Sequence, residues 1–113
     1  MNLTDSHEYR KALGNKMARL RDLRKVTQMD VAYAIGYNST GMLSKIEAGL
    51  SGMSYEQICK AAEFFGIHPA VLMTPQEYTD DELQMIVNLM KLLKDQSNPH
   101  YQSIKSLLDQ AAR

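Results

Sequence analysis

Apolar residues recur at helical spacing along most of this chain. One stripe within residues 6–24 consists of Leu13, Met17, Leu20 and Leu23, which follow one another at steps of three or four. No segment alternates apolar and polar residues as a half-buried strand does, and no Asn-Gly pair offers a hairpin turn. The pattern therefore predicts an all-α protein whose first helix covers residues 6–24.

Residues that favour helix ends divide the rest of the chain into further helices. Short polar side chains that can cap a helix N-terminus are found at Thr27, Ser39, Ser54 and Thr79. Glycines, which readily take the left-handed conformation that follows many helices, stand at positions 36, 49 and 66. Pro69 fits the first position of a short helix. The predicted helices cover residues 28–35, 40–48, 55–65, 69–72, 80–96 and 99–112.

This division predicts a five-helix domain over residues 5–73, a linker over residues 74–79 and a helical region over residues 80–113. A chain of 113 residues can bury a core without disulfides or a metal, and it has room for an appendage. The single cysteine, Cys59, excludes an internal disulfide, and we expect it to be a small buried hydrophobe.

The charges of the chain balance overall but are unevenly distributed. There are 13 Lys and Arg residues and 13 Asp and Glu residues. Residues 10–25 contain seven basic side chains and one acidic side chain, whereas acidic side chains outnumber basic ones from residue 74 onward. A charge run alone is most often a solvated helix face, so it indicates nucleic-acid binding only together with a motif.

A helix-turn-helix pattern occupies residues 26–49, VTQMDVAYAIGYNSTGMLSKIEAG. Two helices joined by a short turn of this kind place the second helix in the major groove of DNA. That helix needs one apolar side as an anchor and an opposite side of short polar side chains that fits the groove. Leu43 and Ile46 meet the first requirement. The second side consists of Thr40, Gly41, Ser44 and Lys45.

The segment resembles the Cro/phage-repressor helix-turn-helix family, also called the xenobiotic-response-element family. The resemblance spans about residues 13–73 and rests on Leu20-Arg21, Thr27-Gln28, Ala32, Gly36, the run Ser44-Lys45-Ile46-Glu47-Ala48-Gly49 and the run Ala61-Ala62-Glu63-Phe64-Phe65-Gly66-Ile67. It implies a five-helix, lambda-repressor-like DNA-binding domain. It also implies a transcription regulator that binds double-stranded DNA at a palindromic operator.

The resemblance implies roles for individual residues as well. The DNA-binding residues that it implies are Gln28, Asn38, Ser39, Thr40, Gly41, Ser44 and Lys45. Gln28 would contact a phosphate, and positions 41, 44 and 45 would read bases. Arg21 and Glu47 match a structural pair that ties the first helix to the third. The turn is one residue longer than the commonest form in the family, so the register at residues 38–39 stays open by one position.

Residues 83–93 are too apolar for a lone surface helix, because eight of these eleven residues are apolar and surround more than half of it. A two-helix hairpin could bury one face and offer the other to a second copy, so we expect an oligomerisation hairpin and a homodimer. The expected dimerisation residues are Leu83, Ile86, Val87, Leu89, Met90, Leu93, Ile104, Leu107 and Leu108. Such a dimer would suit half-sites about one DNA turn apart, roughly 34 Å.

No set of residues suggests catalysis, a cofactor or a metal site. The three histidines are dispersed, and no CxxC pair, Gly-rich phosphate loop or nucleophile–base set can be recognised. The N-terminus lacks the apolar segment of a secretory signal, and no apolar run has the length of a membrane span. We therefore expect a cytoplasmic, nucleoid-associated protein of bacterial or phage type that is not an enzyme.

Repression is the expected mode of regulation, because steric blocking of polymerase has fewer requirements than its recruitment. Two other functions fit the same sequence. The module could belong to an antitoxin or a restriction–modification controller, or the bundle could be a protein-interaction adaptor that binds no DNA. A toxin or an antirepressor would then be a partner in place of a second copy.

Overall fold

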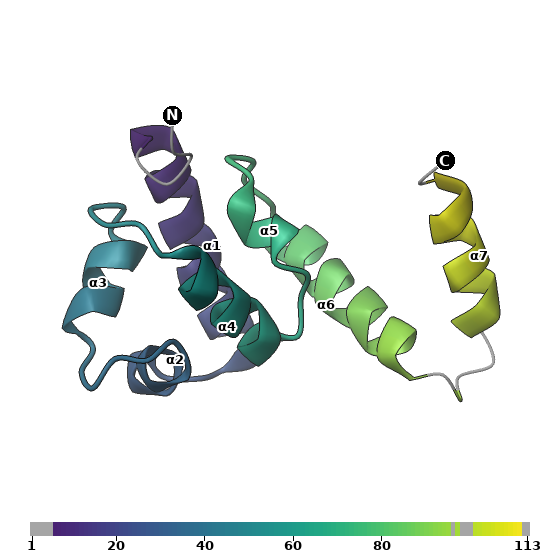
Figure 1. Cartoon of the computed structure of the whole chain (residues 1–113), viewed down its shortest axis with the longest axis horizontal. Coiled ribbons are helices and arrows are strands. Elements are labelled where there is room, and N and C mark those ends of the chain that lie inside the picture. Colours follow the sequence, from purple (N-terminus) through teal and green to yellow (C-terminus); the bar gives the residue numbers. More distant parts are fainter. Residues whose placement is uncertain (1–5, 96, 98–100, 112–113) are drawn as a thin grey trace.

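The computed structural model describes residues 6–95, 97 and 101–111, and all regular structure in these residues is helical. The helices are α1 (His7–Arg24), α2 (Gln28–Ala34), α3 (Gly41–Glu47), α4 (Tyr55–Phe65), α5 (Ala70–Met73), α6 (Asp80–Lys94) and α7 (Tyr101–Ala111) (Figure 1). The prediction of an all-α chain is confirmed. The ends of α1 to α6 lie within two residues of the predicted ones.

Three helices begin at N-caps that the sequence predicts, and each of them forms a reciprocal capping box. At the start of α2, the Asp30 N–H donates to the Thr27 hydroxyl at 3.1 Å, and the Thr27 N–H donates to the Asp30 carboxylate at 3.0 Å. The same reciprocal arrangement opens α4 at Ser54 and α6 at Thr79. Each box satisfies N–H groups that the first turn of a helix leaves unpaired, which is why the sequence locates these starts well.

The start of α3 differs from the prediction. Ser39 lies outside the helix, and the N-cap is Thr40, whose backbone is helical and whose side chain makes no capping hydrogen bond. A capping side chain needs an extended backbone at the N-cap to reach the third N–H of the helix. The prediction of Ser39 as the cap is therefore wrong, and α3 begins at Gly41 rather than at Thr40.

α1 is the central helix of the core. It packs against α3, α5 and α6, while α2 packs against α3 and α4. The stripe residues Leu13 and Leu20 are fully buried, as are Leu43 and Ile46 of α3. Burying a Leu or Ile side chain contributes about 2 kcal/mol, so these contacts fix α3 relative to α1.

α1 and α3 meet at Gly14 with no room for a side chain. A Cβ added to Gly14 would lie 2.2 Å from the Ile46 carbonyl oxygen and 2.8 Å from the Glu47 carbonyl oxygen. The backbones of the two helices therefore approach each other directly, which only glycine permits. This contact positions the C-terminal end of α3 against the middle of α1.

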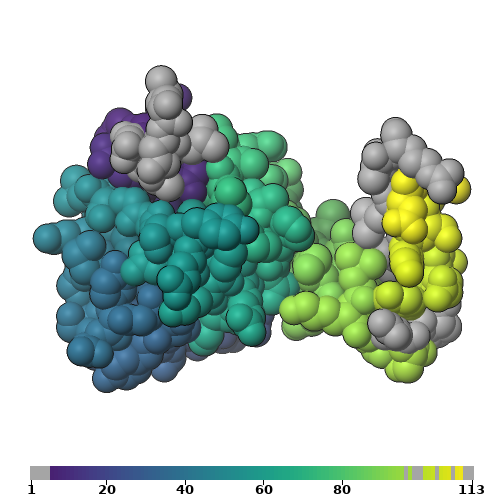
Figure 2. Space-filling model, in the orientation of Figure 1, coloured from purple at the N-terminus to yellow at the C-terminus, as the bar shows by residue number. Residues whose placement is uncertain are grey.

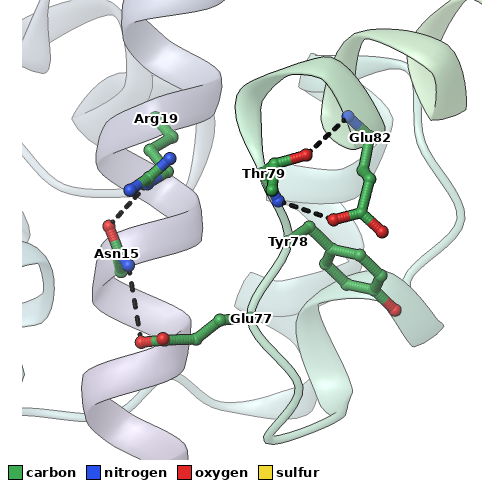
Figure 3. A pocket seen from close by; sticks show the side chains of 6 residues that line it. All are labelled: Asn15, Arg19, Glu77, Tyr78, Thr79 and Glu82. Carbon is green, nitrogen blue, oxygen red and sulfur yellow. Dashed lines mark hydrogen bonds between the residues drawn. The ribbon is translucent and has the colours of Figure 1, made fainter.

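The segment that the sequence suggests as a linker is bound to α1. The Lys16 ammonium, whose residue is only 1% exposed, donates to the carbonyl oxygens of Val71 and Thr74 at 2.7 Å each. The Asn15 amide donates to Glu77 at 3.4 Å, and both residues line a small pocket between α1 and the start of α6 (Figure 3). Residues 74–79 are thus held in place by polar contacts that the sequence does not reveal.

The N-terminal half of α6 belongs to the same core. Leu83 is fully buried and Val87 is 1% exposed, and both belong to the core cluster. The sequence predicts Leu83 and Val87 on a dimerisation surface, and this prediction is wrong. Because α6 packs on α1, both side chains are covered within one chain. The suggested boundary at residues 74–79 therefore does not separate two cores.

α7 contacts α6 and stands apart from the body that α1 to α5 form (Figure 2). In Figure 1, α6 leads away from that body, and α7 turns back so that the two helices form an open V. α3 and α7 lie at opposite ends of the molecule, which extends over 43 Å (Figure 1). A surface on α7 and a surface on α3 can therefore be occupied at the same time.

Candidate nucleic-acid interface

The turn between α2 and α3 is built around Gly36. Its φ of 98° is one that L side chains rarely adopt. The next residue, Tyr37, donates its N–H to the Ala32 carbonyl oxygen at 2.8 Å, which closes the end of α2. The chain is thereby redirected, and α3 packs against α2 (Figure 1).

α3 has one buried side and one exposed side. Leu43 and Ile46 point into the core and are fully buried. Thr40 is half-buried. The exposed residues of α3 and its flanks are Asn38, Ser39, Gly41, Ser44, Lys45 and Ala48. These side chains are short apart from Lys45, and they carry one positive charge and no negative charge.

A hydrogen-bonded network links the exposed side of α3 to α1 and α2. Arg21 of α1 donates from Nε and Nη2 to the two carboxylate oxygens of Glu47, each at 3.1 Å. The Gln28 amide Nε2 donates to Glu47 Oε1 at 3.1 Å, and the Ser44 hydroxyl donates to Gln28 Oε1 at 3.3 Å. The structure therefore brings together Gln28, Ser44 and the Arg21–Glu47 pair, which the resemblance implied only one by one.

The Arg21–Glu47 pair neutralises a negative charge close to this surface. The Glu47 side chain is only 9% exposed. Its hydrogen bonds raise the pKa of the Arg21 guanidinium above its usual value. Two-point Arg–carboxylate pairs are among the stronger hydrogen-bonded contacts in proteins. Since the pair is neutral as a unit, Lys45 dominates the charge on the exposed side of α3.

A second positive charge lies beside the C-terminal end of α3. Gly49, which follows the helix with φ of 77°, approaches Lys11 so closely that an added Cβ would lie 3.3 Å from the Lys11 Cα. The Lys11 side chain is exposed. The sequence shows Lys11 only as part of the basic run. Lys11 and Gly14 are three residues apart and therefore lie on the same side of α1. Only the crossing of α1 with α3 shows that this side faces α3.

The expected dimerisation residues do not form one uniform surface. Leu89 and Leu107 are exposed, at 37% and 66%. Met85, which the expected set omits, is 68% exposed. The half-buried members are Ile86, Met90 and Leu93. The side chains of Ile104 and Leu108 lie outside those that the structure describes.

Two further side chains lie away from α3. Cys59 is partly exposed, which corrects the expectation of a buried residue. His68 accepts a hydrogen bond from the Ala70 N–H at 3.0 Å through Nδ1, at the start of α5. In the described part of the chain, no group of three or more His, Cys, Asp or Glu residues could hold a metal ion.

None of the helices in the described residues is long and apolar enough to cross a membrane.

Comparisons of this chain with protein-family models, with curated proteins and with solved structures find no match in any of the three. The resemblance to the phage-repressor family therefore rests on the residues of this chain alone, and a function for the α3 surface has to follow from its own geometry and chemistry.

Proposed function

We propose that this chain is a sequence-specific DNA-binding transcription regulator that inserts α3 into the major groove. The observation that carries the proposal is the two-sided character of α3. Leu43 and Ile46 anchor it in the core, and its opposite side offers Ser44 and Lys45. The major groove is about 12 Å wide and admits a helix with short polar side chains. On this proposal, α1 to α5 form a lambda-repressor-like domain.

The network around Glu47 supports this role because it orders the surface before DNA binds. Gln28 and Ser44 are each held by a hydrogen bond to a neighbouring side chain. Side chains that are ordered in advance lose less conformational entropy on binding. Gln28 uses one amide hydrogen for Glu47, and its second amide hydrogen can serve a DNA phosphate.

The positive charges near α3 set the expected salt dependence. Lys45 lies on the exposed side of the helix, and Lys11 lies beside its C-terminal end. Each phosphate that a cation neutralises contributes about −0.9 to the slope of log K against log salt concentration. With so few cations at the surface, we expect modest non-specific affinity, so that base contacts carry most of the discrimination.

Selection of bound duplexes from a random DNA pool tests the proposal. We expect the full chain to enrich one palindromic sequence and to bind it less tightly as salt concentration rises. Ser44→Ala and Lys45→Ala should each relax the preference at one position of a half-site, where a lost contact costs about 1–3 kcal/mol. The matched control is Lys105→Ala on α7, at the other end of the molecule, which should leave the selected sequence unchanged.

Two outcomes of this selection would count against the proposal. If a folded chain enriches no sequence, the adaptor function becomes the better interpretation. If a sequence is enriched but neither Ser44→Ala nor Lys45→Ala changes it, α3 is not the reading element.

We further propose that the chain binds DNA as a homodimer through α6 and α7. Met85, Leu89 and Leu107 are exposed apolar side chains on these helices, and covering them with a second copy would remove apolar surface from water, which favours association. A second copy offers the same surface, as a two-fold dimer requires. Two copies would place one α3 on each half-site of a palindrome, with half-sites a whole number of DNA turns apart, about 34 Å per turn.

Regulation would follow from occupancy of the operator. A bound dimer excludes RNA polymerase from an overlapping promoter without contacting it, so we propose repression. Transcription in vitro from a promoter that contains the selected sequence should fall as the protein concentration rises. A rise in transcript would instead indicate an activator.

A further inference from the structure

We infer that Glu47, acting through Gln28, fixes the Ser44 hydroxyl as a hydrogen-bond acceptor toward DNA, so that Ser44 selects a base that carries an exocyclic amino group. The inference rests on the proposed function, because it names the base preference of that same surface. Glu47 and Gln28 act here as positioning residues, and Ser44 is the residue that touches the base.

The first step is the orientation of the Gln28 amide. A side-chain amide has a donor end and an acceptor end, and its environment decides which way it points. Both Glu47 carboxylate oxygens accept hydrogen bonds from Arg21, one from Nε and one from Nη2, so Glu47 acts as an acceptor here. The donor end of Gln28 must therefore face Glu47, as the Nε2–Oε1 distance of 3.1 Å indicates. The reverse orientation would place two oxygens against each other.

The second step is the direction of the Ser44 hydroxyl. With its nitrogen committed to Glu47, Gln28 presents its carbonyl oxygen to Ser44, at 3.3 Å from the hydroxyl oxygen. A carbonyl oxygen cannot donate, so Ser44 must give its only proton to Gln28. The remaining lone pairs of the exposed hydroxyl are then what Ser44 can offer to a neighbouring molecule.

The third step is the match with a base edge. In the major groove, adenine N6 and cytosine N4 present hydrogen-bond donors, whereas guanine O6 and N7 and thymine O4 present acceptors. A serine free to rotate suits either kind of edge. In this chain, pairing with guanine or thymine would require Ser44 to give up its hydrogen bond to Gln28. We therefore expect adenine or cytosine to be preferred at the base under Ser44, by about tenfold.

The experiment uses the full chain and the duplex that it selects. Comparison of the sequences selected by the unmodified chain and by Ser44→Ala identifies the position that Ser44 reads. We expect adenine or cytosine at that position. Replacing it with the analogue that lacks the amino group, purine for adenine or pyrimidin-2-one for cytosine, should weaken binding by about tenfold. The same replacement should leave the affinity of Ser44→Ala unchanged.

Two variants test the positioning residues. Gln28→Met removes the acceptor that holds the Ser44 proton and leaves the Arg21–Glu47 pair intact, so guanine and thymine at this position should bind within about threefold of the preferred base. Glu47→Gln should relax the same position, because an amide at residue 47 no longer dictates the orientation of Gln28. Gln76→Met, an exposed site after α5, is the matched control and should keep the full preference. Thermal unfolding of each variant shows whether it is folded. If Glu47→Gln does not fold, the base preference of Gln28→Met alone tests the positioning role.

Guanine or thymine at the Ser44 position would overturn the inference, and so would a preference for adenine or cytosine that survives in a folded Gln28→Met. A selected sequence that Ser44→Ala does not change would also overturn it, while the proposed function would still stand on Lys45. If the unmodified chain selects no duplex at all, it is the proposed function that fails.

Discussion

At the scale of single residues, Lys16 is the most unusual side chain of the structure. Its ammonium is buried between α1 and the segment after α5, where it donates to Val71 and Thr74 and lies 5.6 Å from the centre of the Tyr78 ring. Burial lowers the pKa of Lys16 to about 8, and the nearby Glu77 carboxylate opposes this shift. In the unfolded chain the same group keeps its ordinary pKa of about 10.5.

This difference predicts how stability depends on pH. Above pH 8 the folded chain releases the Lys16 proton while the unfolded chain still binds it, so the free energy of unfolding should rise with pH. Between about pH 8 and 9.5 the gain is on the order of 2 kcal/mol. In Lys16→Met this rise should be absent. The measurement is urea unfolding of both proteins over this pH range, and equal pH slopes would contradict the assigned pKa.

The pH range of this measurement ends below pH 10 because the ionisation of Tyr9 lowers the free energy of unfolding at higher pH. Its hydroxyl donates to the Leu72 carbonyl oxygen at 2.9 Å, and burial raises its pKa above 10.0. The folded state therefore disfavours the phenolate, and stability should fall again once the pH passes the ordinary pKa of tyrosine.

Residues whose roles are local could be predicted from the sequence, and residues whose roles are tertiary could not. The caps at Thr27, Ser54 and Thr79 depend on side chains three positions away, so the pattern is visible in the sequence. Lys16 looks like any other residue of the basic run, because its partners are 55 and 58 residues away. Its burial is decided by how the segment after α5 returns to α1.

At the scale of elements, the crossing of α1 and α3 decides where the exposed side of α3 faces. Gly14→Ala should separate these helices, because the new Cβ would overlap the carbonyl oxygens of residues 46 and 47. We expect a loss of about 2 kcal/mol or more in the free energy of unfolding. Denaturant unfolding measures it, and unchanged stability would show that the helices are not in contact there.

Gly41→Ala is the matched control for this substitution. Both positions are helical glycines, but a Cβ at Gly41 would meet only the Ser39 hydroxyl oxygen, at 3.9 Å. The alanine should therefore raise stability by up to about 1 kcal/mol, through the lower entropy of the unfolded chain. A comparable loss of stability in both variants would contradict the difference in packing between the two sites.

The positions of the helices could be predicted from apolar spacing and caps, but their packing could not. The sequence shows the strongly apolar character of residues 83–93 without showing which side is covered by which neighbour. Leu83 and Val87 turn out to face the core of their own chain. The start of α3 differs from the predicted start for a related reason. Ser39 is a residue type that often caps helices, but the backbone at Thr40 is already helical.

At the scale of the whole molecule, the exposed apolar residues of α6 and α7 predict self-association. Met85→Glu places a charge in the proposed interface and should shift the chain from dimer to monomer at micromolar concentration, because an unpaired buried charge is costly. Gln84→Glu adds the same charge at the neighbouring exposed position and is the control. Sedimentation equilibrium gives the mass, and an unmodified chain that sediments as a monomer would exclude the dimer.

Substitutions on α3 and in the proposed dimer interface should weaken DNA binding in different ways. A monomeric Met85→Glu variant keeps its α3 surface, so it should still bind a half-site while losing the cooperative gain of a palindrome. Ser44→Ala should show the reverse, with dimerisation intact and base preference changed.

Backbone amide signals in NMR spectra, followed as the selected duplex is added, map directly where DNA contacts the chain. We expect the largest shifts at Gln28 and over residues 38–48, with smaller shifts near Lys11 and none over α7. Shifts concentrated on α6 and α7, or an unperturbed α3 at saturating DNA, would contradict the claim that α3 is the DNA-reading helix.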